Sequence, residues 1–228
     1  MPNEDPAAYW EAMTSEENVH FYEPQAGHRL PHSPFNAIIA PRPIGWISTT
    51  SAGGVLNLAP YSFFNAFNYV PPIIGFASNG AKDSLANAEA TGEFCWNLVS
   101  RDLAEAMNAS SVEAPPDLDE FALAGLTPAE SRLVTPPHVG EARVVFECRT
   151  TQVVPLVSAA NEPTVTSMVF GEVVGVHIDR ALLHEGIYQT AAADPLLRGG
   201  GPSTYFRIRE EDRIDMRRPS PVSPRPQK

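Results

Sequence analysis

The deciding stretch of this chain runs from Pro41 to Lys82 and reads PRPIGWISTTSAGGVLNLAPYSFFNAFNYVPPIIGFASNGAK. Two apolar, strand-like runs, Ile44 to Ile47 and Pro71 to Ala77, each end in a cluster of small polar residues. The second cluster directly precedes Lys82. Hydroxyls, flexible backbone amides and one lysine suit a phosphate, because the N–H groups at a helix start are unpaired and carry partial positive charge.

Strand signals dominate the chain around this stretch. Phe94 to Val99 alternates in period two, and two β-rich runs, Arg143 to Leu156 and Thr164 to Asp179, flank a turn and predict a hairpin. Pro41 and Pro43 predict an edge, a bulge or a strand break, because proline donates no ladder hydrogen bond. Neither a strand–helix–strand alternation nor a GxGxxG motif is present, which argues against a Rossmann fold. The expected fold is mainly β, a barrel with peripheral helices.

Three short helices are expected at the periphery. They are Ala7 to Glu17, a helix that follows Lys82 with Asp83 or Ser84 as its cap and stops at Gly92, and Ser100 to Ala109. The segment from Ala59 to Phe67 is expected to form one or two helical turns or an irregular connection. Trp46, on the strand of the deciding stretch, is expected in the core.

The composition describes a globular protein, with 43% of the 228 residues hydrophobic and 19% charged. A net charge of -11 argues against a nucleic-acid partner, whose phosphates need a basic face. No apolar run approaches the roughly 20 residues that span a bilayer, and no signal-peptide core is present, so the cytoplasm is the expected compartment. Cys95 and Cys148 are expected to be buried reduced thiols, with one bridge as the alternative, and no spacing suggests a metal site.

One domain is expected, since no internal linker interrupts the chain. Residues 1–32 are expected to form an N-terminal helix and a connection, and residues 33–210 the barrel domain. Residues 211–228 form a proline-rich, basic tail, which is expected to be disordered. Within the domain, residues 110–140 are rich in prolines and carboxylates. This insertion is a candidate lid or partner contact, and an ordinary surface excursion is the alternative.

Three sequence runs follow one another along the chain: Ser33 to Thr49 (SPFNAIIAPRPIGWIST), Asn57 to Asn65 (NLAPYSFFN) and Lys82 to Ser84 (KDS). Together they resemble the flavin reductase-like family of FMN-binding split barrels. With a looser match from Asp194 to Tyr205 (DPLLRGGGPSTY), the resemblance covers roughly Ser33 to Ile208. It implies a split β-barrel of the Greek-key type that binds FMN, forms a homodimer and often reduces flavin with NADH or NADPH.

The same resemblance implies the residues of the flavin site. Lys82 is the best placed cation for the FMN phosphate, and Ser84 and the backbone near Asn79 and Gly80 complete the cradle; an exposed turn lysine is the alternative. Arg42 either adds a second cation or pairs with a carboxylate to fix the bend. For the hydroxyl and amide groups near the ring, ordinary turn chemistry is the alternative. The expected flavin contacts are Arg42, Ser48, Thr49, Asn57, Leu58, Ala59, Ser62, Ser78, Asn79, Gly80, Lys82, Asp83 and Ser84.

No motif nominates a nucleophile with its activating base, which fits a cofactor enzyme that moves hydride between a nicotinamide and a flavin. The predicted function is an NAD(P)H:flavin oxidoreductase that passes electrons to free flavin, a partner monooxygenase or another acceptor. His177, Arg198 and Tyr205 are expected at the substrate pocket, with a structural role as the alternative for His177. An added Gly-Pro-Ser before Thr204 leaves the nucleotide donor open. The alternative functions are an FMN-binding electron carrier without a productive nicotinamide site and, third, a haem-binding or structural barrel.

Overall fold

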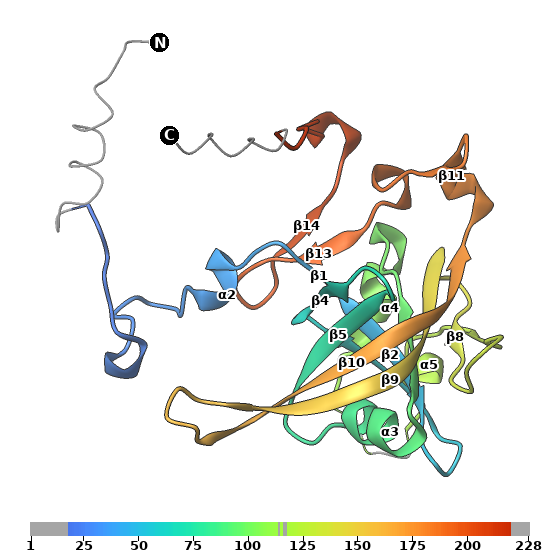
Figure 1. The fold of residues 1–228 in the computed structure, drawn as a ribbon, viewed down its shortest axis with the longest axis horizontal. Coiled ribbons are helices and arrows are strands. Elements are labelled where there is room, and N and C mark those ends of the chain that lie inside the picture. Colours follow the sequence, from blue (N-terminus) through green and yellow to red (C-terminus); the bar gives the residue numbers. More distant parts are fainter. Residues whose placement is uncertain (1–17, 114, 116–117, 220–228) are drawn as a thin grey trace, which may run out of the picture.

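The computed structural model describes residues 18–113, 115 and 118–219. Its centre is a seven-stranded sheet with the strand order β3-β2-β6-β9-β10-β5-β4, in which every neighbouring pair is antiparallel. In Figure 1 this sheet curls into a half-barrel, which confirms the prediction of a mainly β barrel. Its strands are β2 (Gly45–Thr50), β3 (Leu56–Tyr61), β4 (Phe64–Asn68), β5 (Ile73–Asn79), β6 (Glu93–Asn97), β9 (Val144–Val157) and β10 (Pro163–Ile178).

Smaller elements surround this sheet. A second sheet has the order β1 (Arg42–Pro43), β13 (Leu196–Arg198) and β14 (Tyr205–Arg207), and two short pairs are β7 (Pro128–Ala129) with β8 (His138–Val139) and β11 (Leu183–His184) with β12 (Ile187–Tyr188). The α-helices are α2 (Phe35–Ile38), α3 (Asp83–Thr91), α4 (Ala104–Ala109) and α5 (Glu120–Leu123), and 3₁₀ turns occur at Pro24–Ala26, Arg101–Leu103, Arg180–Leu182, Ala191–Ala193 and Glu210–Asp212. In the described part, none of the helices has the length and apolar character needed to cross a membrane. The helix expected at Ala7 to Glu17 and the end of the expected tail lie outside the described residues.

Strand β2 is buried on both faces and supplies two separate cores. Ile47 packs with Phe76 and Phe94 in one cluster. Trp46 joins a second cluster, which includes Phe121 of α5 and is covered by α4 and α5. Successive side chains of a strand alternate between its two faces, so the continuous apolar run of β2 serves both clusters. Trp46 is 0% exposed, which confirms its predicted core position.

Two glycines let aromatic rings close the half-barrel. A Cβ atom on Gly45 of β2 would lie 2.8 Å from the ring of Phe64 on β4, and one on Gly171 of β10 would lie 2.4 Å from the ring of Phe94 on β6. Phe64 also stacks on Trp96, with ring centroids 5.6 Å apart. The approach of Phe64 to Gly45 brings β4, at one end of the strand order, against β2 near the other end, and the approach of Phe94 to Gly171 brings β6 against β10.

Strands β9 and β10 form the predicted hairpin. The N–H of Ser158 donates to the carbonyl of Glu162 and closes its turn. In Figure 1 the far end of the hairpin extends beyond the half-barrel as an arm. Val157 and Val165, near this end, are 56% and 75% exposed, so the arm carries apolar surface that a partner can cover.

The prolines of the deciding stretch do break the strand, as predicted: β1 pairs with β13 in a different sheet from β2. The prediction of helical turns or an irregular connection from Ala59 to Phe67 is wrong, because most of this segment belongs to β3 and β4. Pro60 is compatible with β3 because of the side to which its nitrogen points. The Leu58 N–H points away from β2 to Glu120, and residues two apart in a strand direct their backbone nitrogens to the same side, so the Pro60 nitrogen also points away from β2. Pro60 therefore occupies a strand position that donates no ladder hydrogen bond.

The described residues of the 110–140 segment pack against the half-barrel. They contain α5 and the β7–β8 pair, and they bury Phe121 in the second core cluster. Val134 of the same segment packs with Cys95. Cys95 and Cys148 are both buried and unbridged, as predicted. The described part of the insertion is thus integrated into the folded domain.

Candidate functional site

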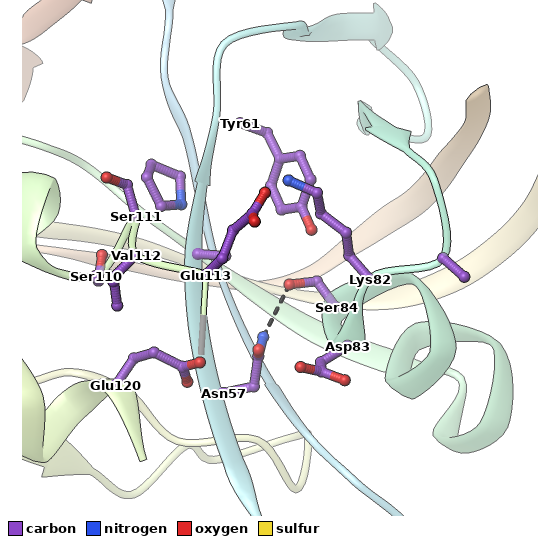
Figure 2. Close-up of a pocket in the computed structure, with 13 residues that line it drawn as sticks. Asn57, Tyr61, Lys82, Asp83, Ser84, Ser110, Ser111, Val112, Glu113 and Glu120 are labelled. Atoms are coloured by element: carbon purple, nitrogen blue, oxygen red, sulfur yellow. Dashed lines mark hydrogen bonds between the residues drawn. The ribbon is translucent and has the colours of Figure 1, made fainter. Parts of the chain in front are cut away.

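One groove collects residues from the polar strand end, the lysine segment and the insertion. It has a volume of about 370 Å³ and lies between β3, the start of α3 and the segment that leads into α5. Figure 2 shows side chains from these three sources facing one another. The expected flavin contacts that line it are Asn57, Ala59, Lys82, Asp83 and Ser84.

Helix α3 begins at this groove. Lys82 is its N-cap residue, and no side chain caps the helix, so the predicted cap by Asp83 or Ser84 is wrong. The backbone at Lys82 is extended and turns into the helix directly at Asp83, one residue too early for either side chain to act as a cap. The helix ends at Gly92 in the left-handed conformation, as predicted. The N–H groups of its first turn and the Lys82 ammonium together can bind an anion.

Asn57 holds the Ser84 hydroxyl in position. Its Nδ2 donates to Ser84 Oγ at 2.8 Å and to Thr49 Oγ1 at 3.1 Å. Asn87 of α3 donates to the same Thr49 oxygen at 3.0 Å. Because Ser84 accepts the bond from Asn57, its own O–H can donate into the groove. Thr49 does not line the groove, but it ties β2 and β3 to the helix that does.

Tyr61 also lines the groove. It is 6% exposed, and its ring packs against Phe76 with centroids 4.7 Å apart. Its hydroxyl lies within hydrogen-bonding reach of the Ser78 and Ser84 hydroxyls, although neither contact has the geometry of a regular hydrogen bond. Burial raises the pKa of this phenol, so the hydroxyl stays protonated and remains a hydrogen-bond donor at neutral pH.

Glu120 faces the groove from the insertion and is 6% exposed. Its Oε2 accepts a hydrogen bond of 3.2 Å from the N–H of Leu58. Burial raises the pKa of Glu120, and the nearby Asp83 carboxylate adds to this shift. A carboxyl that resists ionisation therefore lies across the groove from the helix start that carries Lys82.

A smaller cavity continues the groove along β3. The two share a wall made by Pro60, Tyr61 and Ser111, and the smaller cavity is further lined by Ser62, Arg198 and Tyr205. The Arg198 guanidinium donates to three carbonyls of the 201–204 turn and lies 4.9 Å from the centre of the Tyr205 ring. The structure thus brings two expected substrate-pocket residues next to the expected flavin contacts.

Five other expected flavin contacts form the framework behind the groove or lie beside it. Ser48 and Leu58 are 0% exposed, and Leu58 reaches the site through its backbone N–H. Ser78 is buried and donates to the carbonyl of Gly80 at 3.1 Å. Gly80 has φ +84°, which allows the turn before Lys82, and Asn79 is exposed there. Their contact with a flavin stays a prediction.

Arg42 is buried and directed at backbone carbonyls. Its Nε donates to Ser62 at 2.9 Å, its Nη1 to Asn36 and Ile39, and its Nη2 to Gly199 at 3.2 Å. The alternative of carboxylate pairing is wrong, because all of these partners are carbonyls. The guanidinium instead fastens α2 and the 199 turn to β1, and its expected contact with a flavin stays a prediction.

His177 lies outside the groove and its extension, in a cavity with Glu147 and Arg132. Its Nε2 is 2.5 Å from Glu147 Oε1, and its ring lies 4.9 Å from that of His138, centroid to centroid. β10 directs His177 to the buried Glu147 carboxylate and away from Arg198 and Tyr205, and its expected place at the substrate pocket stays a prediction. This position fits the alternative of a structural histidine.

The groove also contains residues that no sequence signal had singled out: Tyr61, Ser110, Ser111, Glu113 and Glu120. Tyr61 lies inside the NLAPYSFFN run, so its phenol next to Ser62 was an available signal. Glu120 is 62 residues from Leu58 along the chain. No local pattern relates residues at that separation, so only the folded insertion brings the carboxyl into the site.

Comparison with known proteins places this site in context. Residues 39–197 match the family model described as Flavin reductase like domain. An uncharacterised protein of Aquifex aeolicus is 38% identical over 155 residues, which are 66% of this chain and 76% of the relative. The structure of nitrilotriacetate monooxygenase component B from Bacillus cereus is similar with a TM-score of 0.74 and 30% identity over 80% of this chain and 90% of that one. A Shewanella frigidimarina protein with a split barrel domain has a TM-score of 0.71 at 23% identity, over 89% of this chain and 98% of that one, and shares the fold.

Proposed function

Because the chain belongs to the flavin reductase-like domain family, we propose that it is an FMN-dependent oxidoreductase of the cytoplasm. It takes electrons from NADH or NADPH and passes them to free flavin, a partner monooxygenase or another acceptor. The observation that carries this proposal is the continuous groove. It joins an anion-binding helix start at Lys82 to Arg198 and Tyr205 along one wall of β3.

The donors at the start of α3 fit the FMN phosphate. Lys82 supplies the charge, Ser84 a hydroxyl that Asn57 orients, and the first turn of a nine-residue helix supplies backbone N–H groups. Each of these groups donates hydrogen bonds, and a phosphate oxygen accepts them. The donor chemistry therefore matches the most highly charged part of the nucleotide.

Strand β3 supports the rest of the cofactor. It is the first strand in the order of the sheet, so one of its edges is paired with no other strand of the described part. Backbone carbonyls on such an edge can accept a hydrogen bond from the N–H group of a flavin ring, while Ala59 and Pro60 present apolar surface. When bound, FMN supplies a two-electron acceptor for hydride from a nicotinamide. The chain contributes position and electrostatics, with Arg198 and Tyr205 next to the space for the second ring.

The proposal includes a homodimer. Phe35 and Ile38 of α2 are 54% and 71% exposed, and Tyr69 and Val70 are 91% and 79% exposed. Apolar side chains at this level of exposure on several elements indicate a surface that a second chain covers. Light scattering of the purified protein measures this directly, and a mass of one chain at micromolar concentration would exclude the dimer.

Anaerobic titration tests the function. The purified protein is mixed with FMN, its visible spectrum is recorded, and NADH and then NADPH are added in the absence of oxygen. Bleaching of the flavin band faster than for free FMN is the expected result, and it identifies the donor. A bound flavin that neither nucleotide bleaches would establish the electron carrier instead. An unchanged flavin spectrum and no bound FMN would exclude both.

A further inference from the structure

Arg42 and Arg198 form a pair of adjacent cations in the second sheet. They are register partners on the antiparallel strands β1 and β13, which lie beside β14 in Figure 1. Arg42 is 7% exposed. Burial, and then the Arg198 guanidinium, lower the pKa of Arg42, so the two positive charges repel each other across these strands. Like charges withdrawn from water are unfavourable unless an opposite charge lies near them.

No carboxylate of the described residues neutralises this pair. Each hydrogen bond of the Arg42 side chain goes to a backbone carbonyl, and Arg198 donates to three carbonyls of the 201–204 turn. Neither guanidinium takes part in an ion pair within the described ranges. Carbonyl groups satisfy the N–H donors but leave both positive charges in place. Because a buried arginine is normally paired with an anion, we expect a ligand to supply the missing negative charge.

A small cavity gives such an anion access to Arg198. It has a volume of about 170 Å³ and shares a wall with the groove along β3. Arg198 is the one charged side chain in its described lining, whereas Asp83, Glu113 and Glu120 line the groove together with Lys82. The small cavity is therefore the part of this continuous space where a negative charge meets a cation and no carboxylate.

Hydrogen-bond donors remain available for an anion at this cavity. The three bonds of Arg198 use Nη1 and Nη2, so its Nε–H has no partner in the part of the chain that the structure describes. The guanidinium lies 4.9 Å from the centre of the Tyr205 ring, which restricts its orientation. Ser62 and Tyr205 add hydroxyl groups to the lining. A carboxylate accepts such bonds through two oxygens in one plane, and a guanidinium matches that geometry.

The size and the apolar walls of the cavity indicate the rest of the ligand. Pockets for drug-sized ligands have volumes of roughly 300 to 1,000 Å³, so a cavity of about 170 Å³ admits a smaller molecule. Ile44, Pro60 and Met107 line it together with the Tyr205 ring. Apolar and aromatic walls favour a flat ring. A single ring that carries one acidic group satisfies the size, the walls and the charge at once.

We propose that this cavity binds a small aromatic carboxylic acid, with its carboxylate on Arg198 next to Arg42 and its ring against the apolar wall. The inference rests on the proposed function for the flavin in the adjoining groove, and it names the class of ligand that binds beside that flavin. Arg198 then determines specificity, because it rewards a negative charge. A neutral amide of the same shape leaves the arginine pair without a counter-charge.

Calorimetric titration of the purified protein with benzoate and with benzamide tests this inference. The two probes have the same ring and nearly the same size, and they differ in charge. Benzoate is expected to bind at least about 10-fold more tightly, the low end for a hydrogen bond to a charged group. Equal affinities, tighter binding of benzamide, or no binding of either probe would overturn the inference. The comparison needs no variant, so it holds even if the 201–204 turn depends on Arg198.

The Arg198→Gln variant identifies the cation. Its affinity for benzoate is expected to fall to that for benzamide, while benzamide changes less than about twofold. Arg213→Gln is the matched control, because Arg213 is exposed and lines neither the groove nor the small cavity. It removes the same charge and is expected to leave both affinities unchanged. Benzoate binding that persists at full strength in a folded Arg198→Gln protein would overturn the assignment.

FMN binding and reduction are measured separately on the same protein. If the wild type binds benzoate in preference to benzamide but binds no FMN, the proposed function fails and the carboxylate site stands. If NADH or NADPH bleaches bound FMN but benzoate binds no better than benzamide, the carboxylate site alone fails.

Discussion

Glu147 of β9 anchors the insertion to the half-barrel, and its replacement by alanine is expected to be severely destabilising. The side chain is 0% exposed. It accepts the N–H of Arg132 at 2.9 Å and of Leu133 at 2.6 Å, and it lies 2.5 Å from His177 Nε2. Alanine removes the acceptor from all three donors and leaves a cavity in place of the carboxylate.

The size of the effect follows from these contacts. A hydrogen bond to a charged group contributes about 1.5 to 3 kcal/mol, but bonds that share one acceptor do not add fully. Loss of one partner in a buried, charged network typically costs about 3 to 5 kcal/mol. We therefore expect Glu147→Ala to lower the free energy of unfolding by about 3 to 5 kcal/mol, measured by urea denaturation at neutral pH.

The effect depends on pH in a defined direction. Burial opposes ionisation of Glu147, but the hydrogen bonds from Arg132, His177 and Leu133 outweigh it and lower the pKa of the carboxyl below its ordinary value of 4.5. The folded state then binds fewer protons than the unfolded state over that interval, so the stabilisation is complete above about pH 4.5 and is lost as the pH falls through the folded pKa. The difference in the free energy of unfolding between the wild type and Glu147→Ala should therefore become smaller in acid.

Glu89→Ala, an exposed position on α3, is the control and is expected to change stability by less than about 0.5 kcal/mol. A cost for Glu147→Ala below about 1 kcal/mol would refute the anchoring role. A difference in the free energy of unfolding that stays constant or grows in acid would also refute it, because the charged form of Glu147 would then not be the stabilising one.

Four further predictions concern the groove and the core. Lys82→Ala should weaken FMN at least about 10-fold in fluorescence titration with stability unchanged, and an unaltered FMN affinity would discard the phosphate role. Glu120→Gln should raise stability above pH 7 and leave it unchanged below pH 4, because the raised pKa of Glu120 destabilises the fold only where the carboxyl ionises; a loss at high pH would contradict this. Gly171→Ala should cost at least about 1 to 3 kcal/mol in urea denaturation, since its Cβ would lie 2.4 Å from Phe94, and a neutral result would mean that the ring moves freely. Cys95, whose pKa burial raises to about 12, should react with a thiol reagent at pH 8 no faster than the protein opens, whereas rapid labelling would contradict its burial.

Local patterns predicted most of the architecture. The period-two run at β6, the turn between β9 and β10, and the stop of α3 at Gly92 all depend on neighbouring residues, and all three are present. The wrong prediction of helical turns or an irregular connection from Ala59 to Phe67 also comes from using local patterns alone. Pro60 reads as a strand breaker, and only the pairing register reveals that its position on the edge needs no N–H donor.

The chemistry available at the helix start can be predicted from local sequence, because Lys82, Asp83 and Ser84 are adjacent along the chain. Local sequence also indicated Asn57 and Ala59, which lie within one strand. The residues on the opposite side of the groove could be identified only from the folded chain. Glu120 belongs to the 110–140 insertion, and Arg198 lies near the C-terminal end of the described chain.

Tertiary packing likewise separated His177 from the groove and turned Arg42 toward carbonyls. The physical reason is that hydrogen bonding and burial depend on distance in space. Sequence patterns report distance only within a few residues, over one helix turn or one strand. Which polar groups meet across a groove is fixed only when the sheet curls and the insertion packs against it.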